Sequence, residues 1–300
     1  MKTIMKHPAP TVKIISKISE MQEISKEIRK KNISIGFVPT MGALHKGHIS
    51  LIDIAKKHSR FVVVSIFVNP TQFGPKEDFN KYPRTFNKDI ELLSEKKIDI
   101  LFAPTNNEVY PEGYRTYIDI PSFSNKLCGK SRPTHFKGVC TIVAKLFNIV
   151  NPDIAVFGEK DAQQVIILKK MTKDLNFPTK IITGKIIREP NGLAMSSRNK
   201  YLTNKQKQNA SIIYKTLRET ANKINKGERN IPKLKKFIKD GILTKMTYSS
   251  PSENSLKIDY IEIINKNNLQ QPKTLKGECL IAIAVWYGKT RLIDNITVNC

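Results

Sequence analysis

One stretch decides the fold: Ile35-Gly36-Phe37-Val38-Pro39-Thr40-Met41-Gly42-Ala43-Leu44-His45-Lys46-Gly47-His48. An apolar segment comes first, a turn of small residues follows, and apolar residues from Leu51 onward recur at helical spacing. This pattern predicts a buried strand, a turn and a helix that begins at Gly47. Parallel α/β sheets bind ligands at the carboxyl end of such a strand, beside the N-terminus of the following helix. We therefore expect a ligand site at this turn.

The turn supplies backbone freedom and two imidazoles. Gly42 and Gly47 carry no Cβ, so the backbone can approach a ligand closely. His45 and His48 lie on one side of the first helical turn, where imidazoles suit negative charge that develops on phosphate. Two other interpretations stay open. One is that these are ordinary histidines at a helix start. The other is a zinc site, which is weaker because no cysteine or carboxylate stands at ligand spacing nearby.

A second junction of the same kind follows the expected strand over residues 153–157. Gly158 frees the turn, Lys160 offers a point charge for phosphate, and Asp161 can accept hydrogen bonds from ribose hydroxyls. Gln164 lies one helical turn beyond Lys160, so both side chains can face one crevice. A capped helix start with an incidental lysine is the alternative interpretation.

Two further polar clusters stand at the ends of expected strands. Asn69 and Gln72 follow a continuous β-branched strand over residues 61–68, a position suited to ligand binding, although Asn69-Pro70 also fits a simple turn. The cluster Ser196-Ser197-Arg198 offers hydroxyl and guanidinium donors for a triphosphate, although serine-rich turns are common.

Strands and helices alternate up to about residue 186, which predicts an α/β fold with a Rossmann-like doubly wound parallel sheet over residues 1–186. Lysine-rich helices and three strands then predict a smaller C-terminal α+β domain over residues 187–300, with a linker at 248–252. Two local expectations accompany this reading of the chain: a helix over residues 11–32 and a strand over 114–120.

The length and composition of the chain limit the classes of protein to which it can belong. A chain of 300 residues with 40% hydrophobic content is long enough for two domains, and no apolar run approaches the ~20 residues that span a bilayer. Residues 1–8 lack the features of a secretory signal, and the 4 cysteines are scattered. We expect a cytoplasmic protein with no membrane partner.

The formal net charge of +25 suggests a nucleic-acid partner or a phosphate-rich ligand. The lysines are spread through helices and loops, without an arginine-rich arm or an aromatic-interleaved RNA-binding signature. We interpret most of this charge as solvated surface, with non-specific attraction to polyanions and no specific nucleic-acid partner.

Several blocks together resemble the pantothenate synthetase family, the pantoate–β-alanine ligases of coenzyme A biosynthesis. The HxGH element alone is shared by many nucleotidyl transferases, whereas the blocks jointly are specific. They occur in the family's order, at residues 39–48, 65–73, 82–84, 132–139, 157–164 and 192–199.

The resemblance implies that pantoate reacts with ATP to give pantoyl adenylate and pyrophosphate, and that β-alanine then displaces AMP. It implies catalytic roles for His45, His48, Lys160 and Arg198, with His48 as the family's proton donor. We read His48 mainly as stabilising charge on the phosphates. The implied ATP-binding residues are Met41, Gly42, Ala43, Leu44, His45, Lys46, Gly47, His48, Gly158, Glu159, Lys160, Asp161, Ile187, Met195, Ser196, Ser197 and Arg198.

For the other substrates, the resemblance implies that Gln72 and Gln164 bind pantoate and that Gln72 also touches β-alanine; we add Asn69 to this set. It also implies a homodimer and Mg²⁺, which ATP oxygens and water can hold without a protein ligand. Asn191 replaces the family's usual Asp before Gly-Leu-Ala, which we interpret as a change of turn residue.

Two rival functions are weighed against this one. Another HxGH enzyme, such as an aminoacyl-tRNA synthetase fragment or a mononucleotide adenylyltransferase, would use a lysine loop, which residues 245–249 mimic. We interpret that stretch as a decoy, because Met195-Ser196-Ser197-Arg198 already fills the role and no anticodon-binding module is evident. A basic nucleic-acid-binding protein would leave the glycines, histidines and glutamines at strand ends unexplained.

Overall fold

The computed structural model describes residues 12–75, 77–247 and 256–300, and the expectations for residues 1–8 and for the linker at 248–252 lie outside these ranges. The chain divides into two compact units, which are described separately. The first unit comprises the residues up to Ile118 together with Gly138–Phe157 and Thr172–Gly184. The second unit comprises Asp119–Lys137, Gly158–Met171 and Lys185–Cys300.

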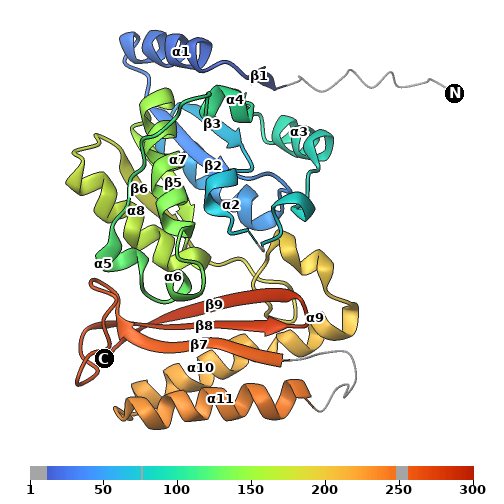
Figure 1. Ribbon diagram of the computed structural model, residues 1–300, viewed down its shortest axis with the longest axis vertical. Coiled ribbons are helices and arrows are strands. Elements are labelled where there is room, and N and C mark those ends of the chain that lie inside the picture. Colours follow the sequence, from blue (N-terminus) through green and yellow to red (C-terminus); the bar gives the residue numbers. More distant parts are fainter. Residues whose placement is uncertain (1–11, 76, 248–255) are drawn as a thin grey trace, which may run out of the picture. The chain divides into compact units, whose positions relative to one another are not determined.

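The sheet of the first unit is six-stranded (Figure 1). Its strands are β1 (Lys13–Ile15), β2 (Ile35–Thr40), β3 (Phe61–Ile66), β4 (Ile100–Phe102), β5 (Ile154–Gly158) and β6 (Lys180–Gly184), in the order β1-β4-β3-β2-β5-β6. The pairs β1–β4, β4–β3, β3–β2 and β2–β5 are parallel. From β2 the chain builds outward through β3 and β4, then returns to add β5 and β6 on the other side. This reversal confirms the doubly wound sheet.

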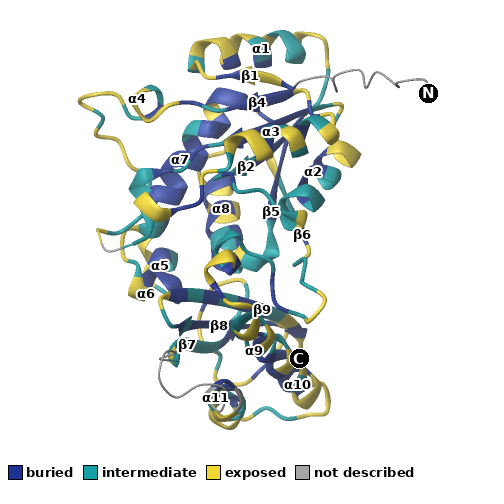
Figure 2. Ribbon diagram, turned by 90° about the vertical axis from the view of Figure 1, so that its right-hand side faces the viewer, coloured by how far each residue is buried: buried dark blue, intermediate teal, exposed yellow. Residues whose placement is uncertain are grey.

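Helices cover this sheet because its strands are apolar on both faces. On one face, α2 (Lys46–His58) packs Ile52 and Ala55 against Val38 and Val64, and α3 (Phe86–Glu95) adds Leu93. Alternate strand residues point to the other face, where α7 (His135–Val150) lies (Figure 2). The remaining helical segments of this unit are α1 (Ile18–Lys30), η1 (Pro70–Gln72), η2 (Phe79–Lys81) and α4 (Asn106–Val109). The helix α8 (Ala162–Asp174) lies mostly in the second unit.

The second unit is built on the antiparallel sheet β7 (Leu256–Asn265), β8 (Glu278–Tyr287) and β9 (Thr290–Asn299). On one face, a core that includes Ile281, Ile283 and Val285 packs with α10 (Ile212–Asn225) and α11 (Ile231–Thr247). On the other face, Leu280 and Ala282 pack with Leu127 and the start of α8. The shorter elements are α5 (Pro121–Ser124), α6 (Cys128–Ser131), η3 (Glu159–Asp161), η4 (Ser197–Tyr201) and α9 (Asn204–Ala210). The C-terminal α+β prediction is confirmed.

Two local expectations are wrong. The helix expected from residue 11 begins only at Ile18, because Lys13–Ile15 pairs as a strand with β4 at the sheet edge. No strand forms over residues 114–120, where the Ile118 N–H donates instead to the Thr141 hydroxyl, at 2.9 Å. The division into domains 1–186 and 187–300 remains a prediction. The two compact units divide the chain differently, because residues 119–137 and 158–171 pack with the C-terminal part of the chain.

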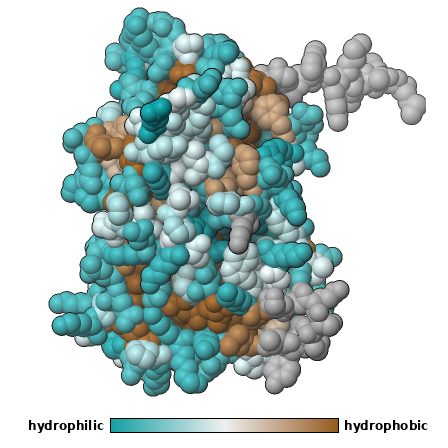
Figure 3. Space-filling view, in the orientation of Figure 1, coloured by the Kyte–Doolittle hydropathy of each residue, from teal (hydrophilic) through white to brown (hydrophobic). Residues whose placement is uncertain are grey.

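The surface is largely hydrophilic on the face drawn in Figure 3, and its most extended apolar area is the brown band across the lower part of the view. The large hydrophobic side chains that are exposed are scattered along the chain: Ile14, Phe86, Tyr117, Leu175 and Tyr201. Of the helices in the described ranges, none combines the length and the apolar character that crossing a bilayer requires.

Candidate functional site

The turn after β2 has an unusual backbone that one buried carboxylate stabilises. Gly42 and Ala43 both have positive φ values, of 78° and 51°. Asp89 of α3 is 1% exposed and accepts hydrogen bonds from the Ala43 N–H at 2.9 Å and the Leu44 N–H at 2.8 Å. A Cβ at residue 42 would lie 3.1 Å from both the Asp89 carboxylate and Ile66. Glycine therefore lets the turn close over the carboxylate.

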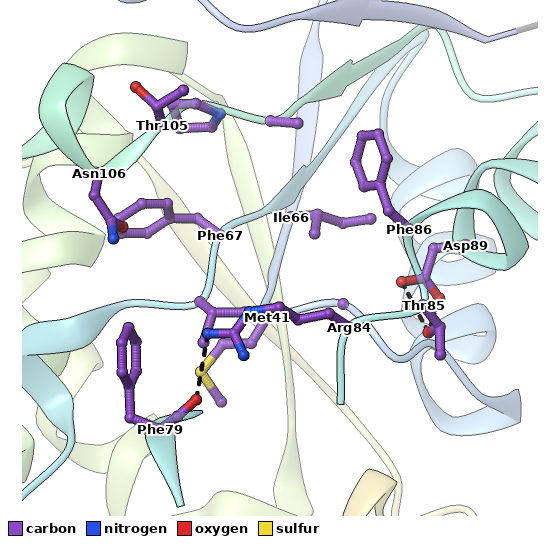
Figure 4. Close-up of a pocket in the computed structure, with 14 residues that line it drawn as sticks. Met41, Ile66, Phe67, Phe79, Arg84, Thr85, Phe86, Asp89, Thr105 and Asn106 are labelled. Carbon is purple, nitrogen blue, oxygen red and sulfur yellow. Dashed lines mark hydrogen bonds between the residues drawn. The ribbon is translucent and has the colours of Figure 1, made fainter. Parts of the chain in front are cut away.

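A pocket borders this turn at the carboxyl ends of β3 and β4 (Figure 4). Its walls are mostly apolar and include Met41, Phe67 and Phe86. Its two charged groups are engaged within the protein: Asp89 holds the turn, and Arg84 donates to the backbone carbonyls of Phe79, Asn80 and Tyr82. The pocket thus shapes one side of the turn without presenting an uncommitted charge to a ligand.

The two histidines begin α2 with a reciprocal cap. His45 is the N-cap, and its Nδ1 accepts from the Gly47 N–H at 3.1 Å, while the Nδ1 of His48 accepts from the His45 N–H at 3.3 Å. The ring centroids are 4.2 Å apart. Because Nδ1 accepts in both rings, each neutral imidazole carries its proton on Nε2 and can donate it to an anion.

The glycine between the histidines is required by this cap. A Cβ at Gly47 would lie 2.8 Å from His45 Cε1 and 2.9 Å from His45 Nδ1, too close for both to keep their places. Lys46 is exposed, and the first turn of α2 contains no acidic residue. The helix N-terminus and its two imidazoles therefore form an environment that favours an anion.

The polar residues after β3 form a buried network. Asn69 is 1% exposed; its amide donates to the Gly138 carbonyl at 3.1 Å and to Gln72 Oε1 at 3.2 Å, and its oxygen accepts from the Tyr110 hydroxyl at 2.8 Å. The Gln72 amide donates to the Met41 sulfur at 2.9 Å. The structure thus brings Gln72 to the turn and gives Asn69 the role of holding Gln72 in place; a direct contact of Asn69 with pantoate remains a prediction.

Two neighbours fix this network further. A Cβ at Gly138 would lie 2.4 Å from the Thr71 carbonyl oxygen and 2.6 Å from the Gln72 nitrogen, so α7 approaches this loop backbone to backbone. Burial raises the pKa of Tyr110 to about 12, so its hydroxyl remains a donor at neutral pH. Lys145 lies over the Tyr110 ring, 5.7 Å from its centroid.

In the second unit, one cavity gathers Lys160, Asp161 and Gln164. The sequence predicted that Lys160 and Gln164 face one crevice, and Asp161 lies there as well. The same cavity includes Arg132 and His135, which belong to the block 132–139 of the family resemblance, and it includes Arg291 and Asn295, which were not assigned a role from the sequence. This wall combines cations and amides with the carboxylates of Asp161 and Asp294, and Arg291 is paired with Asp259 at 2.6 Å.

The structure separates the roles of the adjacent glutamines on α8. Gln163 is 5% exposed; its oxygen accepts from the Cys128 N–H at 3.0 Å, and its amide donates to the carbonyls of Phe123 and Lys126. Gln163 thus holds the backbone of residues 123–128 in place. Gln164 is half-buried and lines the cavity.

The segment that carries Ser196, Ser197 and Arg198 follows directly on a tight hairpin over residues 187–195. The Met195 N–H donates to the Ile187 carbonyl at 3.0 Å, which ties two predicted ATP-binding residues together. Ser196 caps η4, and its hydroxyl accepts from the Arg198 N–H at 3.3 Å. Asn191 accepts from the Leu193 N–H at 3.1 Å, as a turn residue does. All five ATP-binding candidates from residue 187 onward are half-buried: Ile187, Met195, Ser196, Ser197 and Arg198.

Neither metal ligation nor disulfide bonding is seen in the described ranges. No group of three or more His, Cys, Asp or Glu side chains there is placed to hold a metal ion. The cysteines Cys128, Cys140, Cys279 and Cys300, all of them described, form no disulfide.

Comparison with known proteins gives consistent matches. The family model described as "Pantoate-beta-alanine ligase" matches residues 13–297. The pantothenate synthetase of Acetivibrio thermocellus is 48% identical over 288 residues, which cover 96% of this chain and 100% of that protein. That of Thermoanaerobacter sp. is 49% identical over 94% of this chain and 97% of its own length.

Solved structures agree with these sequence matches. The pantothenate synthetase of Thermus thermophilus superposes with a TM-score of 0.87 at 34% identity, covering 96% of this chain and 100% of that one. A pantoate-beta-alanine ligase from Francisella tularensis, complexed with beta-gamma ATP and beta-alanine, gives a TM-score of 0.77 at 38% identity, covering 95% of this chain and 97% of that one.

The Asp89→Asn variant tests the role of the buried carboxylate. An amide side chain has one acceptor oxygen, so the Ala43 or Leu44 N–H loses its partner. We expect the free energy of unfolding to fall by about 1.5–3 kcal/mol, and hydrogen exchange to accelerate at residues 43 and 44. The exposed Asn87→Ala on the same helix serves as control; equal protection of both amides in Asp89→Asn and in the wild type would refute this role.

The Tyr110→Phe variant tests the network around Asn69 by its pH dependence. An unfolded tyrosine titrates near pH 10, whereas the pKa of Tyr110 in the fold is about 12. Between these values the unfolded chain releases a proton that the folded chain retains, so this group's contribution to stability is lost as pH rises through the window. We expect the difference in melting temperature between wild type and Tyr110→Phe to shrink from pH 8 to pH 11. A constant difference would contradict the assignment.

Proposed function

The chain belongs to the pantoate–β-alanine ligase family, and from this premise we propose that it condenses pantoate with β-alanine at the expense of ATP. The pantoate carboxylate attacks the α-phosphorus, and pyrophosphate leaves with the electrons of the broken P–O bond. The β-alanine amine then attacks the acyl carbon of the adenylate, loses a proton, and expels AMP. The substrates supply both nucleophiles, so no serine or cysteine nucleophile is needed.

The observation that carries this proposal is the pair of imidazoles that begin α2. Their Nδ1 atoms accept hydrogen bonds from backbone N–H groups, so a neutral ring carries its proton on Nε2. The Nε2–H groups would donate hydrogen bonds to phosphate oxygens. His45 and His48 would stabilise the charge that builds up as pyrophosphate leaves, with proton transfer from His48 a secondary effect. Met41, Gly42, Ala43, Leu44, Lys46 and Gly47 would shape this part of the ATP site.

The second unit would contribute the remaining cations and the nucleoside contacts. Lys160 and Arg198 would bind phosphate oxygens, and Ser196 and Ser197 would add hydroxyl donors. Asp161 would accept from the ribose hydroxyls, while Gly158, Glu159, Ile187 and Met195 would border the nucleoside. The gathering of Lys160 and Asp161 on one cavity wall supports this part of the proposal.

Pantoate would be bound by Gln72 and Gln164, whose amides match its hydroxyl and carboxylate groups, and Gln72 would also meet β-alanine. The buried Asn69 supports this role by fixing the Gln72 oxygen. Correct placement of the two reactants can contribute about 7–11 kcal/mol to the reduction of the barrier.

Three further properties belong to the proposal. Mg²⁺ would arrive with ATP, held by phosphate oxygens and water without a protein ligand. The chain would act in the cytoplasm, where thiols stay reduced, and as a homodimer. The assay that tests the function combines purified protein, ATP, Mg²⁺ and pantoate, with and without β-alanine. AMP should form only when β-alanine is present; AMP formation independent of both pantoate and β-alanine would refute the proposal.

The His48→Asn variant separates phosphate binding from helix capping. An asparagine oxygen can replace Nδ1 as acceptor for the His45 N–H, but nothing replaces the Nε2 proton. We expect pantoate-dependent pyrophosphate release to fall by about 10²–10³-fold, with the melting temperature nearly unchanged. Lys160→Ala should behave alike, and His58→Ala, an exposed histidine on the same helix, should not. Undiminished pyrophosphate release by His48→Asn would end the assignment.

The Gln72→Ala variant tests the pantoate site. Loss of the amide should raise the KM for pantoate about tenfold, which corresponds to about 1.4 kcal/mol of binding free energy, and change the KM for ATP little. Gln22→Ala, an exposed glutamine on α1, provides the matched control. An unchanged pantoate KM in Gln72→Ala would remove this residue from the site.

A further inference from the structure

Two consecutive polar residues of β9, Asp294 and Asn295, are buried although the proposed function gives neither a role. They are 4% and 7% exposed, respectively. Successive residues of a strand point to opposite faces of the sheet, so one step of β9 presents a carboxylate to one side and an amide to the other. Both residues line the cavity that contains Lys160.

The Asn295 side chain holds the backbone beneath Lys160. Its amide nitrogen donates to the Glu159 carbonyl at 3.0 Å and to the Lys160 carbonyl at 2.9 Å. Both hydrogens of the amide are used on η3, the short helix between β5 and α8. These two bonds orient the turn from which the Lys160 side chain projects.

The Asp294 side chain holds the second predicted ATP-binding segment. Its carboxylate accepts two hydrogen bonds from the Arg188 guanidinium, at 2.6 Å and 2.9 Å. Arg188 also donates to the Gly192 carbonyl at 3.1 Å, and its guanidinium lies over the Tyr214 ring, 3.5 Å from the centroid. The hairpin that leads to Ser196 and Arg198 is therefore anchored on β9.

The charges around Asp294 link the two segments. Burial raises the pKa of its carboxyl, and the positive charges of Arg188 and Lys160 act in the opposite direction. The Asp294 carboxylate also accepts from the Asn295 N–H at 2.8 Å, so the two anchors are joined by a hydrogen bond. Their positions are thus mutually dependent.

From these contacts we infer that Asp294 and Asn295 are positioning residues for the nucleotide: together they fix Lys160 and the hairpin that leads to residues 195–198 in a single arrangement. This inference rests on the proposed ATP-dependent function. Neither residue needs to touch ATP, because each acts through the segment that it holds. Their loss should therefore weaken use of ATP more than use of pantoate. Of the two proposed pantoate ligands, Gln72 belongs to the other unit, and Gln164 lies on α8, beyond the carbonyls of residues 159 and 160 that Asn295 holds.

The test compares Asn295→Ala and Asp294→Asn with Asn299→Ala, an exposed residue of the same strand. KM values for ATP and for pantoate are measured by pyrophosphate release, with melting temperature recorded for each variant. We expect the KM for ATP to rise about tenfold in both buried-site variants, the KM for pantoate to change less than twofold, and Asn299→Ala to match the wild type. The affinity for a non-hydrolysable ATP analogue, measured by calorimetry, should fall by the same factor.

Two results would overturn the inference: an unchanged KM for ATP in both variants, or equal losses for ATP and pantoate that follow the melting temperature. If Asn295→Ala does not fold, Asn295→Ser takes its place, because a serine side chain is too short to bond both carbonyls. A wild-type protein that forms no AMP would instead defeat the proposed function. A wild-type protein that forms AMP and a variant with normal ATP use would defeat only this inference.

Discussion

The buried carboxylate of Asp89 is the constraint on which the first unit's candidate site depends. A positive φ at Ala43 carries strain of roughly 1–3 kcal/mol, and the turn also points two backbone N–H groups into the protein. Hydrogen bonds to a charged acceptor contribute about 1.5–3 kcal/mol each, so the pair that Asp89 accepts outweighs the strain. The turn fixes where α2 begins and so directs both histidines.

A similar arrangement operates in the second unit, but there the anchor is a strand. Asn295 fixes the backbone below Lys160. Asp294 binds Arg188 and thereby fixes the hairpin that leads to Ser196. In both units the groups expected to meet phosphate are thus oriented by buried polar residues that need not touch the ligand themselves. Removing such a partner leaves a buried group unsatisfied, which is costlier than losing a surface contact.

Much of the fold was predictable from local pattern. The β2–turn–α2 and β5–η3–α8 junctions follow from an apolar strand, a glycine and a helical repeat, and the doubly wound order follows from their alternation. The pattern fails at Lys13–Ile15, where pairing with the sheet edge overrides a helical repeat, and at residues 114–120, where a bond to Thr141 replaces strand pairing. In both places distant contacts decide the backbone.

The sequence suggests candidate site residues where the side-chain type is itself suited to binding phosphate, as with His45, His48 and Lys160. Residues that act by position were missed. Asp89 lies in a helix 45 residues beyond Leu44, and Asn295 is 135 residues beyond Lys160, so no local motif joins them to the turns that they hold. Gln163 and Gln164 are adjacent and chemically identical, and only burial shows that the first is structural.

The most direct measurement of the central claim follows an oxygen atom. Pantoate labelled with ¹⁸O in its carboxylate is incubated with the protein, ATP, Mg²⁺ and β-alanine, and the AMP is examined by mass spectrometry. If the carboxylate attacks the α-phosphorus, each turnover transfers one labelled oxygen to AMP. AMP that carries no label, or label that leaves with inorganic phosphate, would contradict an adenylate intermediate.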